Sequence, residues 1–407
     1  MVTRRQALKS VGGMVLGYGA GLIAGSRAVA SAAETTVTLP FGNSERPLVT
    51  YPGKRALIGL TSRPPQLETP FSVFNEGILT PNDAFFVRYH LADIPLEIDP
   101  AAFRLEVKGK VSTPLSLSLD ELKTRFDPVE YVAVHQCSGN SRGFFEPRVG
   151  GGQAGNGLMG NARWKGVPLK AVLEKAGIAS GAVEVYFTGL DGPVIPETPR
   201  FAKSLKLDHA LDGEVMLAYQ MNGEDLPWLN GFPLRLVVPG YFGTYWVKHL
   251  NQIAVLDTPL DNFWMSTAYR IPDNDCACVP AGGKPEKTVP IGRFAVRSFL
   301  TNVLDGAKVA AGKPVLLRGI AFDGGSGIAR VEVSPDGGKT FIPASLGADL
   351  GKYSFREWTA HVTLPAGRQA LMVRATNTLG QTQPMAASWN PSGYLRSAVE
   401  TTNVVAG

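Results

Sequence analysis

Cysteine, histidine and charge are all scarce in this sequence of 407 residues. It contains three cysteines and five histidines, and charged residues make up 18%. Three cysteines are too few for a disulfide framework, and the spacing of Cys276 and Cys278 is typical of neither a zinc ligand pair nor a Cys-x-x-Cys redox motif. No Cys-x-x-Cys-His motif occurs, so we expect no haem attached to this chain.

The net charge of +5 comes largely from the N-terminus. Residues 1–33 contain Arg4, Arg5, Lys9 and Arg27 and no acidic residue, so the remaining chain is close to neutral. Binding to nucleic acid requires a concentrated basic surface, which the remaining sequence does not provide. We therefore expect no nucleic-acid partner.

The first 33 residues have the order of a twin-arginine export signal. The paired arginines precede a weakly apolar, glycine-rich run over residues 11–25, and small residues follow as far as Ala33. A membrane anchor is the alternative, but about 15 residues is shorter than the roughly 20 that span a bilayer. We expect cleavage after Ala32 or Ala33, a periplasmic location, and no membrane span after processing.

The 46 glycines and 30 prolines favour turn-rich β structure with few long helices. Residues 34–290 are interpreted as one domain of short strands and helices that begins with a proline-rich extended arm at residues 34–95. Within it, strands are predicted at 103–109, 131–135, 182–187 and 234–238. Helices are predicted at 118–126, from a capping box, and at 168–177, from a starting proline and a closing glycine.

After residue 290 the helix signals disappear. Strands are predicted at 315–321, 328–334, 358–364 and 369–376, separated by glycine-containing turns. This spacing indicates an immunoglobulin-like sandwich over residues 291–407. Such a domain either binds a partner or covers the catalytic domain, and the sequence favours neither role.

Cys137 is the strongest candidate for a functional cysteine. It follows a predicted strand and precedes a polar turn, and a lone cysteine in such a place is either a small buried hydrophobe or a ligand. Arg142, five residues on, would favour the thiolate, which is a soft donor for a transition metal. Because no second cysteine or histidine cluster accompanies Cys137, a metal here must bring most of its own ligands.

Two further segments carry cations near apolar anchors. In residues 85–90, Arg88 and His90 alternate and would share one side of a strand, although a surface arginine beside a core-capping histidine is the commoner explanation of such a pair taken alone. In residues 230–248, Arg235 and Lys248 flank glycine and proline turns that suit a phosphate, or form an ordinary β-turn-β. Residues 150–155 satisfy a Gly-x-Gly-x-x-Gly pattern, but no convincing strand precedes it, so we expect a loop over the site rather than a dinucleotide fingerprint.

These clusters together resemble the sulfite oxidase family of molybdenum enzymes, and the molybdenum subunit of bacterial periplasmic sulfite dehydrogenases in particular. The resemblance covers nearly all of the mature chain. The motifs that carry it are Phe-Phe-x-Arg-x-His at 85–90, Gln-Cys-x-Gly-Asn at 136–140, Met-Asn-Gly at 221–223, Gly-Phe-Pro-x-Arg with Val-Val-Pro-Gly and Val-Lys at 231–248, and Trp-Asn-x-x-Gly-Tyr at 389–394. The implied fold is α+β, with a sulfite-oxidase-type molybdopterin-binding core and the C-terminal sandwich.

The resemblance also implies a cofactor and a set of site residues. Molybdenum would be held by one pterin dithiolene and by Cys137, and Arg88, Arg142 and Tyr269 would line the substrate pocket. The residues implied to bind the cofactor are Phe86, Val87, Arg88, Tyr89, His90, Asp191, Asn230, Arg235, Trp246, Val247 and Lys248. Asn230 stands where many relatives have histidine, and Tyr245 where many have arginine.

By this resemblance we expect a periplasmic sulfite dehydrogenase that oxidises sulfite to sulfate. Because the chain has no fused haem domain, the electrons would go to a c-type cytochrome, as a subunit in a heterodimer or as a soluble protein serving a homodimer. One alternative is a molybdenum enzyme that reduces sulfoxides or a similar oxidised substrate. A metal-free exported binding protein is the alternative from another class, and it leaves Cys137, Arg88 and Arg142 without a task.

Overall fold

The structure is a computed structural model that describes residues 36–407, and the predicted export signal lies outside these residues. Strands dominate and helices are short, as the glycine and proline content predicts. The α-helices of the described part are α1 (Leu119–Arg125), α2 (Leu169–Ala176), α3 (Leu207–Ala210) and α4 (Phe263–Ser266). None of these helices has the length and apolar character needed to cross a bilayer.

The first five strands form one antiparallel sheet in which each strand pairs with its neighbour in sequence. They are β1 (Thr36–Thr38), β2 (Glu45–Val49), β3 (Leu57–Ser62), β4 (Pro65–Glu68) and β5 (Val87–Arg88). The sequence indicated an extended arm here, but these residues form a sheet of their own. The prolines permit this because some fall at tolerated positions, such as Pro65 at the first residue of β4.

Two further sheets follow, in which neighbouring strands are mostly not consecutive in sequence. The first, in spatial order, is β11 (Ala202–Lys206), β10 (Glu184–Gly189), β15 (Leu250–Leu256), β6 (Leu105–Gly109) and β7 (Leu115–Leu117). The second is β13 (Glu224–Asp225), β12 (Met216–Met221), β9 (Met159–Pro168) and β8 (Val129–Gln136), with β14 (Arg235–Val237) also beside β12. The predicted strands at 103–109, 131–135, 182–187 and 234–238 are thus confirmed as β6, β8, β10 and β14.

Both predicted helices are present, with the expected ends. Ser118 Oγ accepts a hydrogen bond from the backbone N–H of Glu121, and the Glu121 carboxylate accepts one from the N–H of Ser118, which completes the capping box of α1. Helix α2 begins directly after Pro168 and ends at Gly177, whose φ of 70° allows the chain to leave the helix.

The C-terminal strands form two sheets around a shared core. One sheet is ordered β18 (Arg297–Leu300), β20 (Pro314–Phe322), β24 (Arg356–Thr363) and β23 (Ser345–Leu346). The other is ordered β19 (Ala307–Val309), β26 (Glu400–Ala406), β25 (Gly367–Asn377), β21 (Ile328–Ser334) and β22 (Ile342–Pro343). Leu317, Trp358, Val333 and Val373 pack between them.

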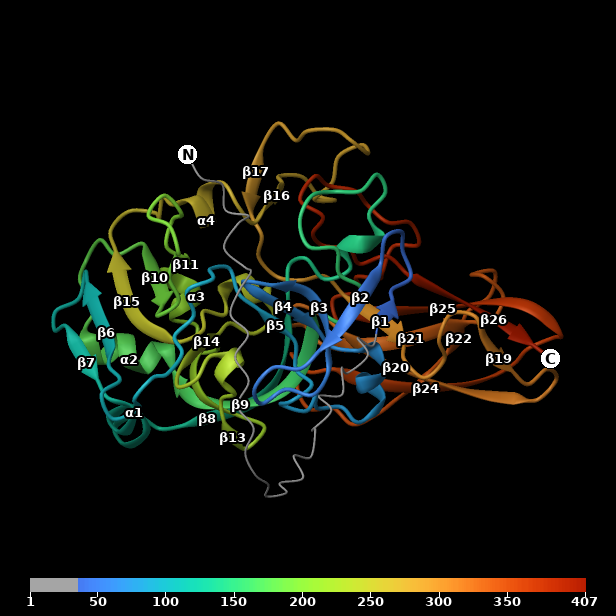
Figure 1. Ribbon diagram of the computed structural model, residues 1–407, viewed down its shortest axis with the longest axis horizontal. Coiled ribbons are helices and arrows are strands. Elements are labelled where there is room, and N and C mark those ends of the chain that lie inside the picture. The colour runs from blue at the N-terminus through green and yellow to red at the C-terminus, as the bar shows by residue number, and fades with distance from the viewer. Residues whose placement is uncertain (1–35) are drawn as a thin grey trace, which may run out of the picture. The chain divides into compact units, whose positions relative to one another are not determined.

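The hairpin of β16 (Arg270–Pro272) and β17 (Thr288–Pro290) lies in sequence between the sheets of residues 36–256 and the two C-terminal sheets (Figure 1). Its loop contains a disulfide between Cys276 and Cys278. Cys137 is therefore the free cysteine of the chain's described part.

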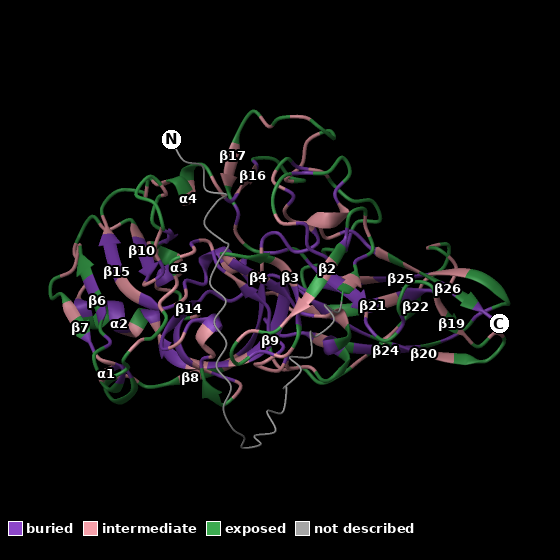
Figure 2. Cartoon of the chain, viewed as in Figure 1, coloured by how far each residue is buried: buried purple, intermediate pink, exposed green. Residues whose placement is uncertain are grey.

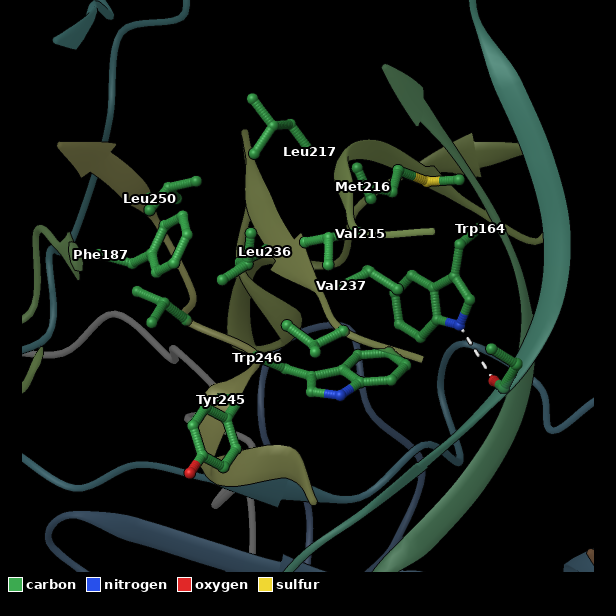
Figure 3. Packing of buried hydrophobic residues seen from close by; sticks show 14 of the residues in the cluster. Trp164, Phe187, Val215, Met216, Leu217, Leu236, Val237, Tyr245, Trp246 and Leu250 are labelled. Carbon is green, nitrogen blue, oxygen red and sulfur yellow. Dashed lines mark hydrogen bonds between the residues drawn. The ribbon is translucent and has the colours of Figure 1, made fainter. Parts of the chain in front are cut away.

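The largest hydrophobic core lies beneath the sheets that hold β8, β14 and β15. Figure 2 shows buried residues concentrated on these strands. Trp164 and Trp246 meet edge to face in this core with ring centroids 5.5 Å apart (Figure 3). Trp164 also donates a hydrogen bond from Nε1 to the carbonyl of Ala133 in β8 (3.1 Å), which fixes the strand that leads to Cys137.

Candidate active site

Cys137 lies where the buried strand β8 ends. Its backbone N–H donates to the carbonyl of Leu158 (2.9 Å), and its own carbonyl accepts from the N–H of Asn140 (3.0 Å). Ser141 then adopts a left-handed φ of 68° and leads into a single 3₁₀ turn over Arg142–Phe144. The strand thus delivers the thiol to a rigid turn, where it is half-buried and lines two cavities.

The larger cavity has a volume of about 530 Å³ and brings together the residues predicted to bind substrate. Arg88, Arg142 and Tyr269 line it together with Cys137. Arg88 donates from Nη2 to the hydroxyl oxygen of Tyr269 (3.2 Å), and Arg142 donates from Nη2 to the carbonyl of Ser392 (3.2 Å). The sequence prediction that these four residues share one site is therefore consistent with the structure.

The charge of this cavity suits a small anion. Its described lining residues include two arginines and no aspartate or glutamate. Burial raises the pKa of Tyr269, so the phenol remains protonated at neutral pH and can donate a hydrogen bond. Two guanidinium groups and a phenol can orient an oxyanion by charge-assisted hydrogen bonds.

A smaller cavity shares Arg88, Cys137 and Tyr269 with the larger one. Phe86, Arg88 and His90 line it, whereas Val87 and Tyr89 are buried in a separate cluster with Leu57, Leu67 and Leu229. This alternation confirms the prediction that Arg88 and His90 face the same side of an extended segment. Burial, followed by the charges of Arg88 and Lys248, lowers the pKa of His90 well below its ordinary value, so its imidazole is neutral.

Unpartnered polar atoms surround the smaller cavity. His135 Nδ1, Ser138 Oγ and Thr244 Oγ1 are buried without a hydrogen-bond partner, and all three residues line it. Lys248 Nζ donates to the carbonyl of Arg88 (2.6 Å), and burial lowers the pKa of Lys248 to about 7. Buried polar groups are normally satisfied, so these atoms indicate a polar ligand at this position.

The other residues predicted to bind the cofactor are buried and line neither cavity. Arg235 is fully buried against both Trp164 and Trp246, with its Cζ 5.0 and 5.6 Å from their ring centroids, and burial lowers its pKa to about 9. Arg235 donates from Nη1 to the carbonyl of Asn230 (2.8 Å). The buried carboxyl of Asp191 has a raised pKa, caused by burial and partly offset by Lys248. Val247 and Trp246 are buried core residues.

Two buried lysines that the sequence did not indicate lie beside predicted site residues. Lys54 donates from Nζ to Asn230 Oδ1 (2.5 Å) and to the carbonyl of Phe85 (2.9 Å), and burial lowers its pKa to about 7. Lys203 is also buried, and its Nζ lies 5.5 Å from the ring centroid of Tyr269. No local sequence pattern marks either lysine. His135 and Ser138, by contrast, could have been inferred from their closeness to Cys137 at the end of a strand.

A molybdopterin cofactor fits the chemistry of these residues. A pterin has polar ring edges and carries a phosphate, which require hydrogen-bonding groups and cations, and the smaller cavity offers both. The volume of this cavity is about 20 Å³, room for about one water, so the match to a pterin lies in the chemistry of the lining residues and not in the volume. Among residues 36–407 no group of three histidine, cysteine or acidic side chains gathers as a metal site, which leaves Cys137 as the candidate ligand.

Two protein-family models match the chain. The oxidoreductase molybdopterin binding domain matches residues 91–264, and the Mo-co oxidoreductase dimerisation domain matches residues 288–402. The first match contains Cys137, Arg142, Asp191, Asn230 and Lys248. The second contains the C-terminal sheets.

Curated relatives and a solved structure agree with these matches. Sulfite oxidase of Gallus gallus is 34% identical over 364 residues, which are 86% of this chain and 77% of that protein. Mitochondrial sulfite oxidase of Macaca fascicularis is 35% identical over 356 residues, 83% of this chain, although the chain spans only 64% of that relative's length. The sulfane dehydrogenase SoxCD of Paracoccus pantotrophus shares the fold, with a TM-score of 0.72, 23% identity, and coverage of 95% of this chain and 92% of that chain. The protein belongs to the sulfite oxidase family, and its cofactor is molybdenum carried by molybdopterin.

Proposed function

We propose that this protein is a sulfite dehydrogenase that converts sulfite to sulfate and passes the electrons, one at a time, to a c-type cytochrome. The observation that carries the proposal is the convergence of Arg88, Arg142 and Tyr269 on the free thiol of Cys137 in a cavity without lining carboxylates. Relatives named sulfite oxidase, at about 35% identity over most of the chain, support the same activity.

Each site residue has a distinct task in this proposal. Cys137 provides the protein's thiolate ligand to molybdenum, and when bound the cofactor supplies oxygen-atom transfer and accepts two electrons. Arg88 and Arg142 attract the small dianion and fix its orientation, and Tyr269 adds a neutral hydrogen-bond donor. Lys248, Ser138 and Thr244 would hold polar groups of the cofactor by hydrogen bonds.

The location and the electron acceptor also belong to the proposal. The twin-arginine pattern at residues 1–33 supports export to the periplasm, and the disulfide between Cys276 and Cys278 suits an oxidising compartment. The two C-terminal sheets are proposed to form an immunoglobulin-like sandwich. The match to a dimerisation domain supports contact with a second copy or with a cytochrome subunit.

The test is sulfite-dependent reduction of a c-type cytochrome by the purified, molybdenum-loaded protein. Arg88→Gln removes a cation from the cavity, so we expect the KM for sulfite to rise at least about tenfold, because hydrogen bonds to charged groups contribute more than neutral ones. Arg368→Gln, at an exposed position in β25, serves as the control and should leave the KM unchanged. A molybdenum-loaded protein that reduces no cytochrome with sulfite would contradict the proposal.

A further inference from the structure

The ring of Tyr394 lies against two of the predicted substrate-binding residues. The Arg142 Cζ lies 5.0 Å from the centroid of the Tyr394 ring. The Tyr269 ring stacks on Tyr394 with centroids 5.8 Å apart and planes 7° from parallel. All three residues line the larger cavity. One aromatic ring thus contacts groups from two distant segments of the catalytic region.

Hydrogen bonds of Asn390 and Trp389 fix the turn that carries Tyr394. Asn390, which is buried, donates from Nδ2 to the carbonyl of Tyr394 (2.8 Å) and accepts from its N–H (3.2 Å). Trp389 donates from Nε1 to the carbonyl of Pro147 (2.8 Å), and its carbonyl accepts from the N–H of Val279 (2.9 Å). The position of the ring is therefore fixed by the surrounding chain before any substrate binds.

The same turn approaches Arg142 closely because it contains Gly393. This residue has a φ of 62°, and a β-carbon built on it would lie 3.0 Å from Cγ of Arg142 and 2.4 Å from a methyl carbon of Val149. Only glycine suits both the backbone conformation and the space. The side chain of Arg142 therefore lies directly against the turn.

Arg142 depends on this turn because it has few other partners. No carboxylate lies within salt-bridge distance of it among the described residues, and its Nε is buried without a hydrogen-bond partner. Its side chain donates to the carbonyl of Ser392, lies against the ring of Tyr394, and packs closely against Gly139, Gly151 and Gly393. A ring face holds a guanidinium by cation–π attraction without neutralising its charge, so the charge remains available to an anion.

We propose that Tyr394 is a positioning residue for anion binding, and that its ring, rather than its hydroxyl, holds Arg142 and Tyr269 in place at the cavity. The inference rests on the proposed function for the identity of the anion. It predicts that removing the ring weakens binding of sulfite, and of the product sulfate, because the guanidinium loses its fixed direction. It also predicts little change in kcat, because Tyr394 acts on the binding of the anion through Arg142 and Tyr269.

The test compares Tyr394→Phe with Tyr394→Leu in the full, cofactor-loaded protein. We expect Tyr394→Phe to keep the KM for sulfite and the Kd for sulfate, measured by calorimetry, within about twofold of wild type, because the ring is retained. We expect Tyr394→Leu to raise both about tenfold with kcat nearly unchanged. Phe341→Leu is the matched control, since it removes a ring that lies 3.9 Å from the Cζ of Arg374 outside the cavity.

Equal losses in the phenylalanine and leucine variants would overturn the inference, because the hydroxyl would then carry the effect. An unchanged Kd for sulfate in Tyr394→Leu would overturn it too. Should Tyr394→Leu fail to fold, Tyr394→Met gives the same comparison with an unbranched apolar side chain. If wild type binds sulfate but does not oxidise sulfite, the proposed function fails while the sulfate Kd still decides the role of Tyr394.

Discussion

At the scale of single residues, the position of the Arg142 guanidinium is set partly by the glycines around it. A β-carbon built on Gly139 would lie 2.8 Å from Nη1 of Arg142 and 3.0 Å from its Cζ. One on Gly151 would lie 2.7 Å from Nη1. Gly139 does not have a positive φ, so alanine fits its backbone and only the guanidinium has to move.

Gly139→Ala should therefore displace Arg142 without unfolding the turn. We expect a rise of about tenfold in the KM for sulfite, comparable to the loss of a charge-assisted hydrogen bond, with the melting temperature nearly unchanged. Steady-state kinetics and thermal unfolding measure the two quantities. Gly42→Ala is the control, because no atom lies within 4 Å of a β-carbon built there. A variant with wild-type KM would show that Arg142 does not need its present position.

Local sequence patterns predicted which side of a strand a side chain lies on better than they predicted how deeply it is buried. The two-residue alternation correctly placed Arg88 and His90 on one side, because strand geometry alone fixes it, and Phe86 lines the same cavity. The sequence did not indicate that Asn230 and Arg235 would be buried away from both cavities. Their burial depends on packing against residues distant in sequence, such as Lys54, which no local pattern reveals.

At the scale of elements, strand β4 anchors the loop that borders the larger cavity. The two carboxylate oxygens of Glu68 accept hydrogen bonds from the N–H groups of Gly155 and Gly157, each at 2.9 Å. Glu68 is buried, and burial raises its pKa from 4.5 to about 7, although the two backbone hydrogen bonds oppose the shift. The loop carries Gly150, Gly151 and Gly152 along the cavity wall.

The pKa of Glu68 predicts how stability changes with pH. Between pH 4.5 and about 7 the Glu68 carboxyl keeps its proton in the folded state and loses it in the unfolded state. Its contribution to the stability of the fold is therefore fully present below pH 4.5 and is lost as the pH rises to about 7. Glu68→Gln cannot ionise, so we expect its unfolding free energy to lack this decline. Denaturant unfolding across this pH range measures it, with the exposed Glu97→Gln as control. Parallel curves for wild type and Glu68→Gln would contradict the assignment.

Helices whose end signals lie close together in sequence were predicted correctly. The sheet of β1 to β5, which depends on the pairing of separate strands, was not. The capping box of α1 and the proline and glycine ends of α2 lie within a few residues of each other, so the sequence reveals them directly. The sheet of β1 to β5 depends instead on which strands pair, and prolines within residues 36–88 obscured it.

At the scale of the whole molecule, the C-terminal sheets contribute to the site itself. Arg297 of β18 is buried and donates to Ser141 Oγ (2.9 Å), in the turn that follows Cys137, and to Glu400 Oε1 of β26 (3.0 Å). Tyr394, from the segment between β25 and β26, reaches Arg142. Motif order in the sequence indicated the family, but the contacts of Arg297 with Ser141 and of Tyr394 with Arg142 join residues more than 150 positions apart and required the structure.

The central claim is that the thiolate of Cys137 binds molybdenum in a cavity where Arg88 and Arg142 receive the substrate. X-ray absorption at the molybdenum edge tests it most directly, on wild type and on Cys137→Ser purified side by side. The account predicts about one molybdenum per chain in wild type and one sulfur ligand fewer in Cys137→Ser, because serine offers oxygen in place of sulfur. An identical sulfur shell in the two proteins, or wild type without molybdenum, would contradict it.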